Sequence, residues 1–97
     1  MTMSVAPYET DSPKEPRLCE VLFFAGVSDL AKTRSLIIPV QADHTFAGLR
    51  ADLVAKFPRL KNFLPLCALA GDGMIASDAD KIGEIQVIAV LPPVSGG

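Results

Sequence analysis

The sequence predicts an α+β domain in which a mixed sheet of four to five strands packs on one main helix. Three observations support this prediction. The apolar segments follow the order strand, strand, helix and then two or three further strands. Only one stretch has a clear helical periodicity. The last apolar segment is the most hydrophobic in the chain, which is typical of a strand in the middle of a sheet.

Composition limits the kind of protein this is. The 97 residues fit one domain, and 49% hydrophobic with 21% charged residues is ordinary for a globular protein. The net charge is −2, and no cluster of Lys and Arg indicates binding to nucleic acid. No apolar run approaches the roughly 18 residues of a membrane-spanning helix. No targeting segment is recognisable at the N-terminus, so we expect a cytoplasmic protein that binds no membrane.

The chain divides into three parts. Residues 1–16 contain three prolines, mixed charges and little periodicity, which predicts a disordered arm. The folded domain is expected over residues 17–91, and residues 92–97 are expected to form an extended tail.

The first predicted strand is L-C-E-V-L-F-F-A, over residues 18–25. Alternation along a strand sends successive side chains to opposite faces. The inward set indicates core: Cys19, Val21 and Phe23. The outward set carries one charge and two large hydrophobes, which is unusual for a face in solvent: Glu20, Leu22 and Phe24.

A short helix is expected after Gly26, over residues 27–32, with Ser28 or Asp29 near its start. The second strand is S-L-I-I-P-V, over residues 35–40. Its Pro39 has no N–H to donate, so this strand should lie at an edge of the sheet or end there.

The main helix begins after Thr45, which is a plausible N-cap. Pro58 ends it. Between them the apolar side chains recur at helical spacing: Phe46, Leu49, Leu53 and Phe57. This stripe predicts a helix that lies on the sheet.

The second half of the chain returns to strands. Residues 66–70 predict a third strand, 71–73 a turn, 74–76 a short strand, 77–84 a loop and 85–91 the last strand. This order fits the β-grasp, the ubiquitin-like arrangement. A ferredoxin-like fold fits less well because it needs a second long helix.

Few residues within the domain indicate chemistry. Cys19 and Cys67 have no metal-ligand spacing and are expected to be buried thiols. The only histidine, His44, has no partner at ligand spacing and is expected at the solvated surface. We find no metal site, catalytic triad or phosphate loop in the sequence.

The end of the sequence, V-L-P-P-V-S-G-G, is interpreted as a reactive tail. Pro92 and Pro93 end sheet pairing and favour an extended chain. The five residues after Pro92 can then reach about 15 Å from the domain. Gly96 and Gly97 lack side chains, so they can enter a channel too narrow for a Cβ atom.

A carboxylate at Gly97 is an anion and a poor electrophile at neutral pH, so it needs activation, most simply as an acyl-adenylate made with ATP. Attack by sulfur would then leave a thiocarboxylate, and attack by an amine would give an amide. The tail alone is compatible with either a sulfur carrier or a protein modifier.

Two segments carry a resemblance to a known family. E-V-L-F-F-A-G-V-S-D-L-A (20–31) and V-L-P-P-V-S-G-G (90–97) resemble the MoaD-type sulfur carriers, the small subunits of molybdopterin synthase. The resemblance implies a β-grasp fold and a Gly97 that a ubiquitin-activating-type adenylyltransferase adenylates with ATP before it becomes a thiocarboxylate. The tail would enter a large MoaE-type subunit in a two-plus-two heterotetramer, and Gly96 would allow it to thread into that subunit. There the sulfur passes to cyclic pyranopterin monophosphate.

The same resemblance implies how partners dock. The chain itself would bind no cofactor and would act as a non-catalytic, sulfur-donating subunit. Hydrophobes at the base of the tail, together with the tail, would contact the partners: Phe24, Met74, Leu91, Pro92, Pro93, Val94 and Ser95. Alternatively, Leu22, Phe24, Met74 and Leu91 pack beneath a loop as a second small core. Other functions left open are a carrier for thiazole or tRNA thiolation, a ubiquitin-like modifier and a plain interaction module.

Overall fold

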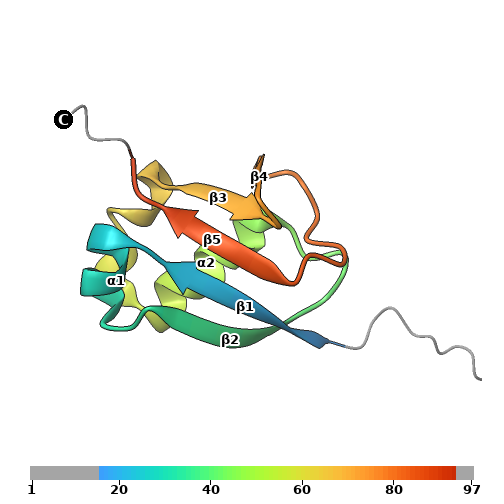
Figure 1. Cartoon of the computed structure of the whole chain (residues 1–97), viewed down its shortest axis with the longest axis horizontal. Coiled ribbons are helices and arrows are strands. Elements are labelled where there is room, and N and C mark those ends of the chain that lie inside the picture. The colour runs from blue at the N-terminus through green and yellow to red at the C-terminus, as the bar shows by residue number, and fades with distance from the viewer. Residues whose placement is uncertain (1–15, 94–97) are drawn as a thin grey trace, which may run out of the picture.

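The computed structural model describes residues 16–93 of the chain (Figure 1). The strands are β1 (Arg17–Phe23), β2 (Ser35–Val40), β3 (Ala68–Gly71), β4 (Met74–Ala76) and β5 (Val87–Leu91). The helices are α1 (Ala25–Ala31) and α2 (Phe46–Lys56), and two short 3-10 helices follow α2: η1 (Pro58–Leu60) and η2 (Leu64–Leu66). The predicted arm, apart from its last residue, and the tail beyond Pro93 lie outside the described residues.

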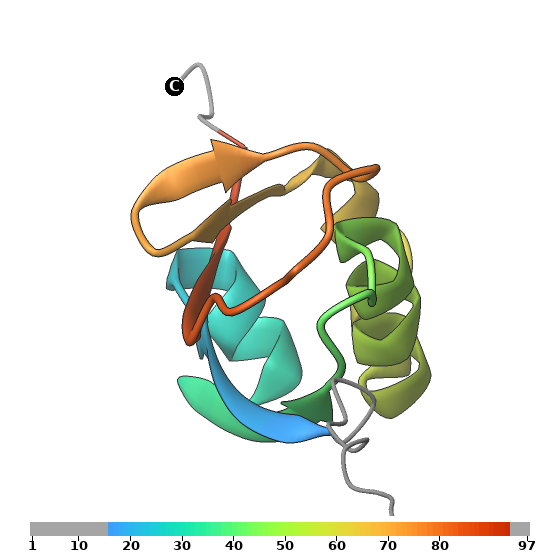
Figure 2. The same cartoon turned by 90° about the vertical axis from the view of Figure 1, so that its right-hand side faces the viewer.

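The five strands form one mixed sheet in the order β2-β1-β5-β3-β4. β1 and β5 are parallel, and the other neighbours are antiparallel. The last strand therefore lies in the centre, as its hydrophobicity predicts, and β2 with Pro39 lies at an edge. Seen from the side, α2 lies across one face of the sheet (Figure 2). The predicted α+β class and β-grasp arrangement are confirmed.

The core lies between α2 and the sheet. The predicted inward set of β1 is buried, with Val21 fully inaccessible to solvent. Three positions of the predicted helical stripe are buried, and Thr45 caps α2 by accepting a hydrogen bond from the N–H of Gly48 at 3.1 Å. The stripe ends at Phe57, whose ring packs edge-on against Phe23 with 5.6 Å between the ring centroids. Alternation and helical periodicity therefore identify the core correctly.

Several element boundaries differ from the prediction. β1 ends at Phe23, and α1 begins at Ala25 because the chain turns there through a left-handed conformation, with φ of 51°. β3 begins only at Ala68, since residues 64–66 form a 3-10 turn around Pro65.

β5 begins at Val87 rather than at residue 85, because Ile85 leaves the ladder and packs over Gly71. A Cβ atom on Gly71 would lie 2.6 Å from the Ile85 side chain, so any larger residue there would force that side chain to move.

The loop 77–84 is fixed by hydrogen bonds to the start of α2. The carbonyls of Asp78 and Asp80 accept from Ala47 and Phe46, whose N–H groups have no partner within the helix. Arg50 of α2 makes two further contacts. Its Nε donates to the carboxylate of Asp78 at 2.9 Å, and its Nη1 donates to the carbonyl of Leu64 at 2.6 Å. The loop thus closes one end of the core.

Both cysteines are buried free thiols, as predicted. Burial raises the pKa of Cys19 and of Cys67 above the ordinary value of 9.0. Every helix found between residues 16 and 93 is too short or too polar to cross a bilayer.

Candidate functional site

The candidate site lies where β1 and β5 end side by side. Phe23 is the Cα partner of Val90 in the parallel ladder, so the next residues, Phe24 and Leu91, leave the two strands at the same end of the sheet. Leu91 makes the last pair of β5, with Ala68 of β3. The chain then continues through Pro92 and Pro93 away from the sheet (Figure 1). Pro92 and Pro93, the described part of the predicted tail, therefore leave the sheet beside Phe24.

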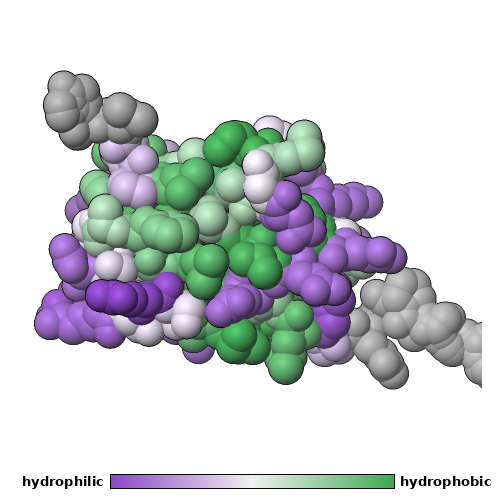
Figure 3. Space-filling model, viewed as in Figure 1, coloured by the Kyte–Doolittle hydropathy of each residue, from purple (hydrophilic) through white to green (hydrophobic). Residues whose placement is uncertain are grey.

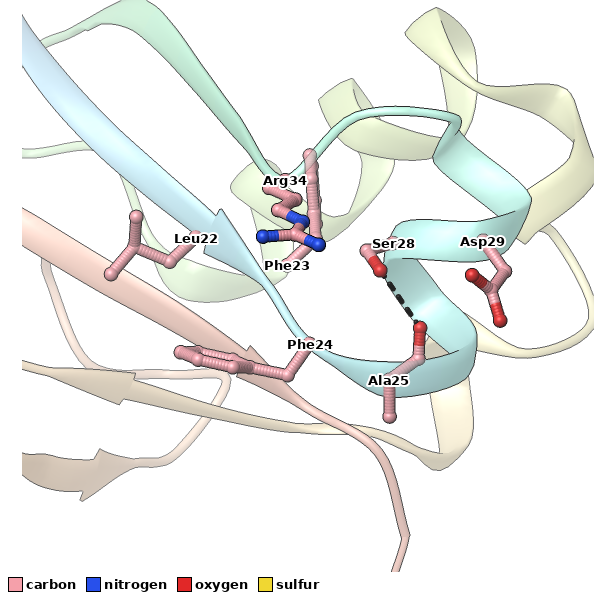
Figure 4. Close-up of a pocket in the computed structure, with 7 residues that line it drawn as sticks. All are labelled: Leu22, Phe23, Phe24, Ala25, Ser28, Asp29 and Arg34. Carbon is pink, nitrogen blue, oxygen red and sulfur yellow. Dashed lines mark hydrogen bonds between the residues drawn. The ribbon is translucent and has the colours of Figure 1, made fainter.

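The backbone places the Phe24 ring outside the core. Phe24 is extended and is the N-cap of α1, and the left-handed Ala25 turns the chain directly after it. As a result Phe23 is 3% exposed and Phe24 is 44% exposed, although they are consecutive. The Phe24 ring and the Leu22 side chain extend in the same direction, away from α1 (Figure 4).

We call the sheet face opposite α2 the outer face. Strand register assigns to it an almost continuous apolar set: Leu18, Leu22, Ile37, Pro39, Ala68, Ala70, Ile75, Val87, Ala89 and Leu91. The space-filling view shows this apolar surface over the strands (Figure 3). Three of its members are more than half exposed: Leu18, Ile37 and Ile75. Large apolar patches on a small protein commonly mark binding surfaces.

Met74 does not join Phe24 and Leu91. It pairs with Gly71, which pairs with Ile88, so register puts Met74 on the α2 side of the edge strand β4. It is 74% exposed and lies toward the start of β5, not toward the tail.

The next residue, Ile75, lies on the outer face, opposite Ala70. Sequence reasoning missed Ile75. The two-residue Asp72-Gly73 turn, with positive φ at both residues, sets this register and could have indicated it.

A hollow of about 510 Å³ lies beside Phe24, at the junction of β1, α1 and the start of β2 (Figure 4). Leu22 and Phe24 supply apolar walls, and the polar groups come from Ser28, Asp29 and Arg34. The Ser28 hydroxyl donates to the carbonyl of Ala25, and Arg34 makes no ion pair within residues 16–93. An apolar hollow bordered by groups of both charges is suited to contact with another protein.

The other candidate groups lie elsewhere. His44 lies at the surface as expected, with its side chain 32% exposed, and its Nε2 atom is 2.9 Å from the carboxylate of Asp52 on α2, a contact that the sequence did not predict. In the described part of the chain no group of His, Cys, Asp or Glu could hold a metal ion. Of the predicted tail contacts, Pro92 is half-buried and Pro93 exposed, and Val94, Ser95, Gly96 and Gly97 lie outside the described residues.

Comparison with known proteins identifies the family to which this chain belongs. The ThiS family model matches residues 21–97. A molybdopterin synthase sulfur carrier subunit from Caenorhabditis briggsae is 31% identical over 80 residues, which are 80% of this chain and 95% of that protein.

Solved structures of similar proteins share the fold. SAMP1 of Haloferax volcanii, a small archaeal modifier protein, has a TM-score of 0.70 and 25% identity over 84% of this chain and 100% of its own. A complex of subunits 1 and 2 of the molybdopterin-converting factor from Helicobacter pylori contains a chain that is 28% identical, with a TM-score of 0.59 over 84% of this chain and 100% of that one. The resemblance inferred from the sequence is confirmed. The chain belongs to the ThiS family.

Proposed function

We propose that this chain is the sulfur carrier subunit of a molybdopterin synthase. The observation that carries the proposal is the point at which β5 ends: this central strand stops at Leu91 beside the exposed Phe24, and in the sequence a Pro-Pro-Val-Ser-Gly-Gly segment follows. The family match extends through that segment to residue 97. The curated relative from Caenorhabditis briggsae carries the same function in its name.

The chemistry proposed takes place at Gly97. Its carboxylate attacks the α-phosphorus of ATP on a ubiquitin-activating-type adenylyltransferase, and pyrophosphate leaves. A sulfide equivalent then displaces AMP from the acyl carbon, and a thiocarboxylate remains. The chain itself binds no cofactor in this scheme, because ATP belongs to the partner. Gly96 contributes by lacking a Cβ atom, which lets the end of the tail enter a narrow channel.

The outer face is the proposed docking surface for the large subunit. Phe24 and Leu91 lie at the base of the tail, so a partner that takes in Val94, Ser95 and the glycines meets them first. Pro92 and Pro93 extend that contact. Met74 contributes only if the partner also reaches around the edge strand β4.

The thiocarboxylated tail would then deliver sulfur to cyclic pyranopterin monophosphate held by the large subunit. We place this reaction in the cytoplasm, in a heterotetramer with two copies of each subunit. The complex of subunits 1 and 2 from Helicobacter pylori supports a large-subunit partner.

The proposal is tested by intact mass spectrometry. The protein is incubated with the adenylyltransferase of its own organism, ATP and sodium sulfide as the sulfur source, and it is then isolated under conditions that do not hydrolyse a thiocarboxylate. A sulfur carrier gains the mass difference of one oxygen replaced by sulfur, and the gain maps to the C-terminal peptide. An unchanged mass, in a preparation in which the adenylyltransferase hydrolyses ATP normally, would contradict the proposal.

A second candidate is a ubiquitin-like protein modifier, favoured by the 25% identity and TM-score of 0.70 with SAMP1. The same experiment separates the two functions. A modifier would appear as amide-linked adducts on lysines of other proteins, each carrying the C-terminal glycine of this chain. A carrier for thiazole or tRNA thiolation would gain sulfur but would fail to convert the pterin.

A further inference from the structure

The outer face contains a single charged strand residue, Glu20 of β1. Register places it between Ile37 of β2 and Val87 of β5. Leu18 and Leu22 flank it two residues away along β1, on the same face. Every other strand position that register assigns to this face is apolar except Ser35. The carboxylate therefore interrupts an otherwise apolar surface.

Glu20 has no partner for its charge within residues 16–93. The side chain is half-buried, and it makes no ion pair or side-chain hydrogen bond there. It lines a hollow of about 450 Å³ together with Leu18, Ile37 and Val87. Arg17 also borders this hollow, but its guanidinium donates to the carbonyl of Gly83 instead.

A protein that covers this face must also remove water from Glu20. Burying an unpaired carboxylate is costly, whereas burying one against a cation with good geometry is tolerated or favourable. We propose that the large subunit places a guanidinium or ammonium group against Glu20, so that this carboxylate selects the partner and fixes its orientation on the sheet. This inference rests on the proposed function, because it takes the large subunit as the protein that covers the outer face.

Two other occupants fit the charge less well. A second copy of this chain, related by a two-fold axis, would present the same face and bring two Glu20 carboxylates toward each other. The arm of residues 1–15 precedes β1 and has Lys14 as its only basic residue, among Glu9, Asp11 and Glu15, so its net charge repels Glu20. A cationic site on a separate protein is the better complement.

The test is calorimetric titration of the full chain with the purified large subunit of the same organism. Glu20→Gln keeps the shape and removes the charge, and we expect its affinity to fall about thirtyfold or more. Asp52→Asn is the matched control: it removes the same charge from α2, on the other side of the sheet, and should change the dissociation constant by less than about twofold. Thermal unfolding of both variants should match that of the parent protein.

Equal or tighter binding by Glu20→Gln would overturn the inference. Such a result is expected when the buried carboxylate has no cationic partner, because neutralising it removes the free-energy cost of burying its charge. Phe24→Ala is titrated in parallel to separate the two proposals. If Phe24→Ala weakens binding and Glu20→Gln does not, the docking face stands and the role of Glu20 is wrong; if neither does, both fail.

Two measurements on the chain alone test the other occupants. A dimer in sedimentation that Glu20→Gln strengthens would assign the face to a second copy. If deletion of residues 1–14 tightens binding in the parent but not in Glu20→Gln, the arm is the partner of the charge, which also overturns the inference.

Discussion

Replacing Phe24 with alanine tests whether the ring at the base of the tail serves binding rather than folding. The ring is 44% exposed, and it lies at the N-cap of α1 beside the last residue of β5. The part that remains exposed is available to a partner. We therefore expect Phe24→Ala to weaken binding to the large subunit strongly and to lower the unfolding temperature only slightly.

The magnitude follows from the exposed area. A phenylalanine presents roughly 200 Å² of surface, so the 44% that is exposed corresponds to about 90 Å². Covering that area contributes about 2 kcal/mol at roughly 25 cal/mol per Å². The expected loss of affinity is therefore about thirtyfold.

Phe23→Ala is the matched control, because it removes the same ring from the core. Phe23 is 3% exposed and packs edge-on against Phe57. Its truncation should cost about 3–5 kcal/mol of the free energy of unfolding. Calorimetric titration and thermal unfolding of both variants measure the contrast. If Phe24→Ala unfolds readily and its remaining folded fraction binds normally, Phe24 belongs to the core and the reasoning is refuted.

Three further predictions concern the tail, the arm and the thiols. Deleting Gly97, or adding a residue after it, should abolish thiocarboxylation in the mass-spectrometric assay and leave thermal unfolding unchanged. Gly96→Ala should reduce thiocarboxylation less, because the carboxylate of Gly97 stays intact. A protein shortened to begin at Glu15 should keep its stability and its affinity for the large subunit, and a large loss in titration would place the arm in the interface. Burial raises the pKa of both thiols, so their contribution to stability is complete below the pKa of the unfolded chain and is lost as the pH rises through the folded values. The free energy of unfolding should therefore fall above about pH 9, and Cys19→Ala should reduce that fall in a denaturant titration repeated across the alkaline range.

The sequence alone was sufficient for the fold because local patterns and burial agree. Alternation in β1 separates Val21 from Glu20, and helical spacing in α2 marks Leu49 and Leu53 as core. Pro39 restricts β2 to an edge, and the apolar β5 requires neighbours on both sides. Each of these signals is contained within one segment, so it can be read without knowledge of the rest of the chain.

Features that depend on distant contacts were not predictable in the same way. The loop 77–84 is held by the N–H groups at the start of α2, some thirty residues earlier in the sequence. Ile85 leaves the strand because Gly71 offers it a packing site. Neither segment contains a local sequence pattern that predicts these contacts.

The candidate site was predicted in part. Phe24 and Leu91 were expected at the base of the tail, and the parallel pairing of β1 with β5 brings them to one end of the sheet. Met74 was expected with them, but the register of the β3–β4 hairpin places it on the other face and leaves Ile75 on the outer face. That Glu20 is the single charged strand residue on the outer face could be recognised only once the strands that pair with β1 were known.

Transfer of sulfur from Gly97 to a pterin is the reaction proposed for this chain, and it can be measured directly. Thiocarboxylated protein is mixed with the large subunit and cyclic pyranopterin monophosphate, and the mass of the carrier and the pterin product are followed together. We expect the carrier to return to its carboxylate mass as molybdopterin forms, with two carriers consumed per dithiolene because each delivers one sulfur atom. A thiocarboxylate that persists beside an active large subunit, while the pterin gains no sulfur, would show that this chain is not the sulfur donor.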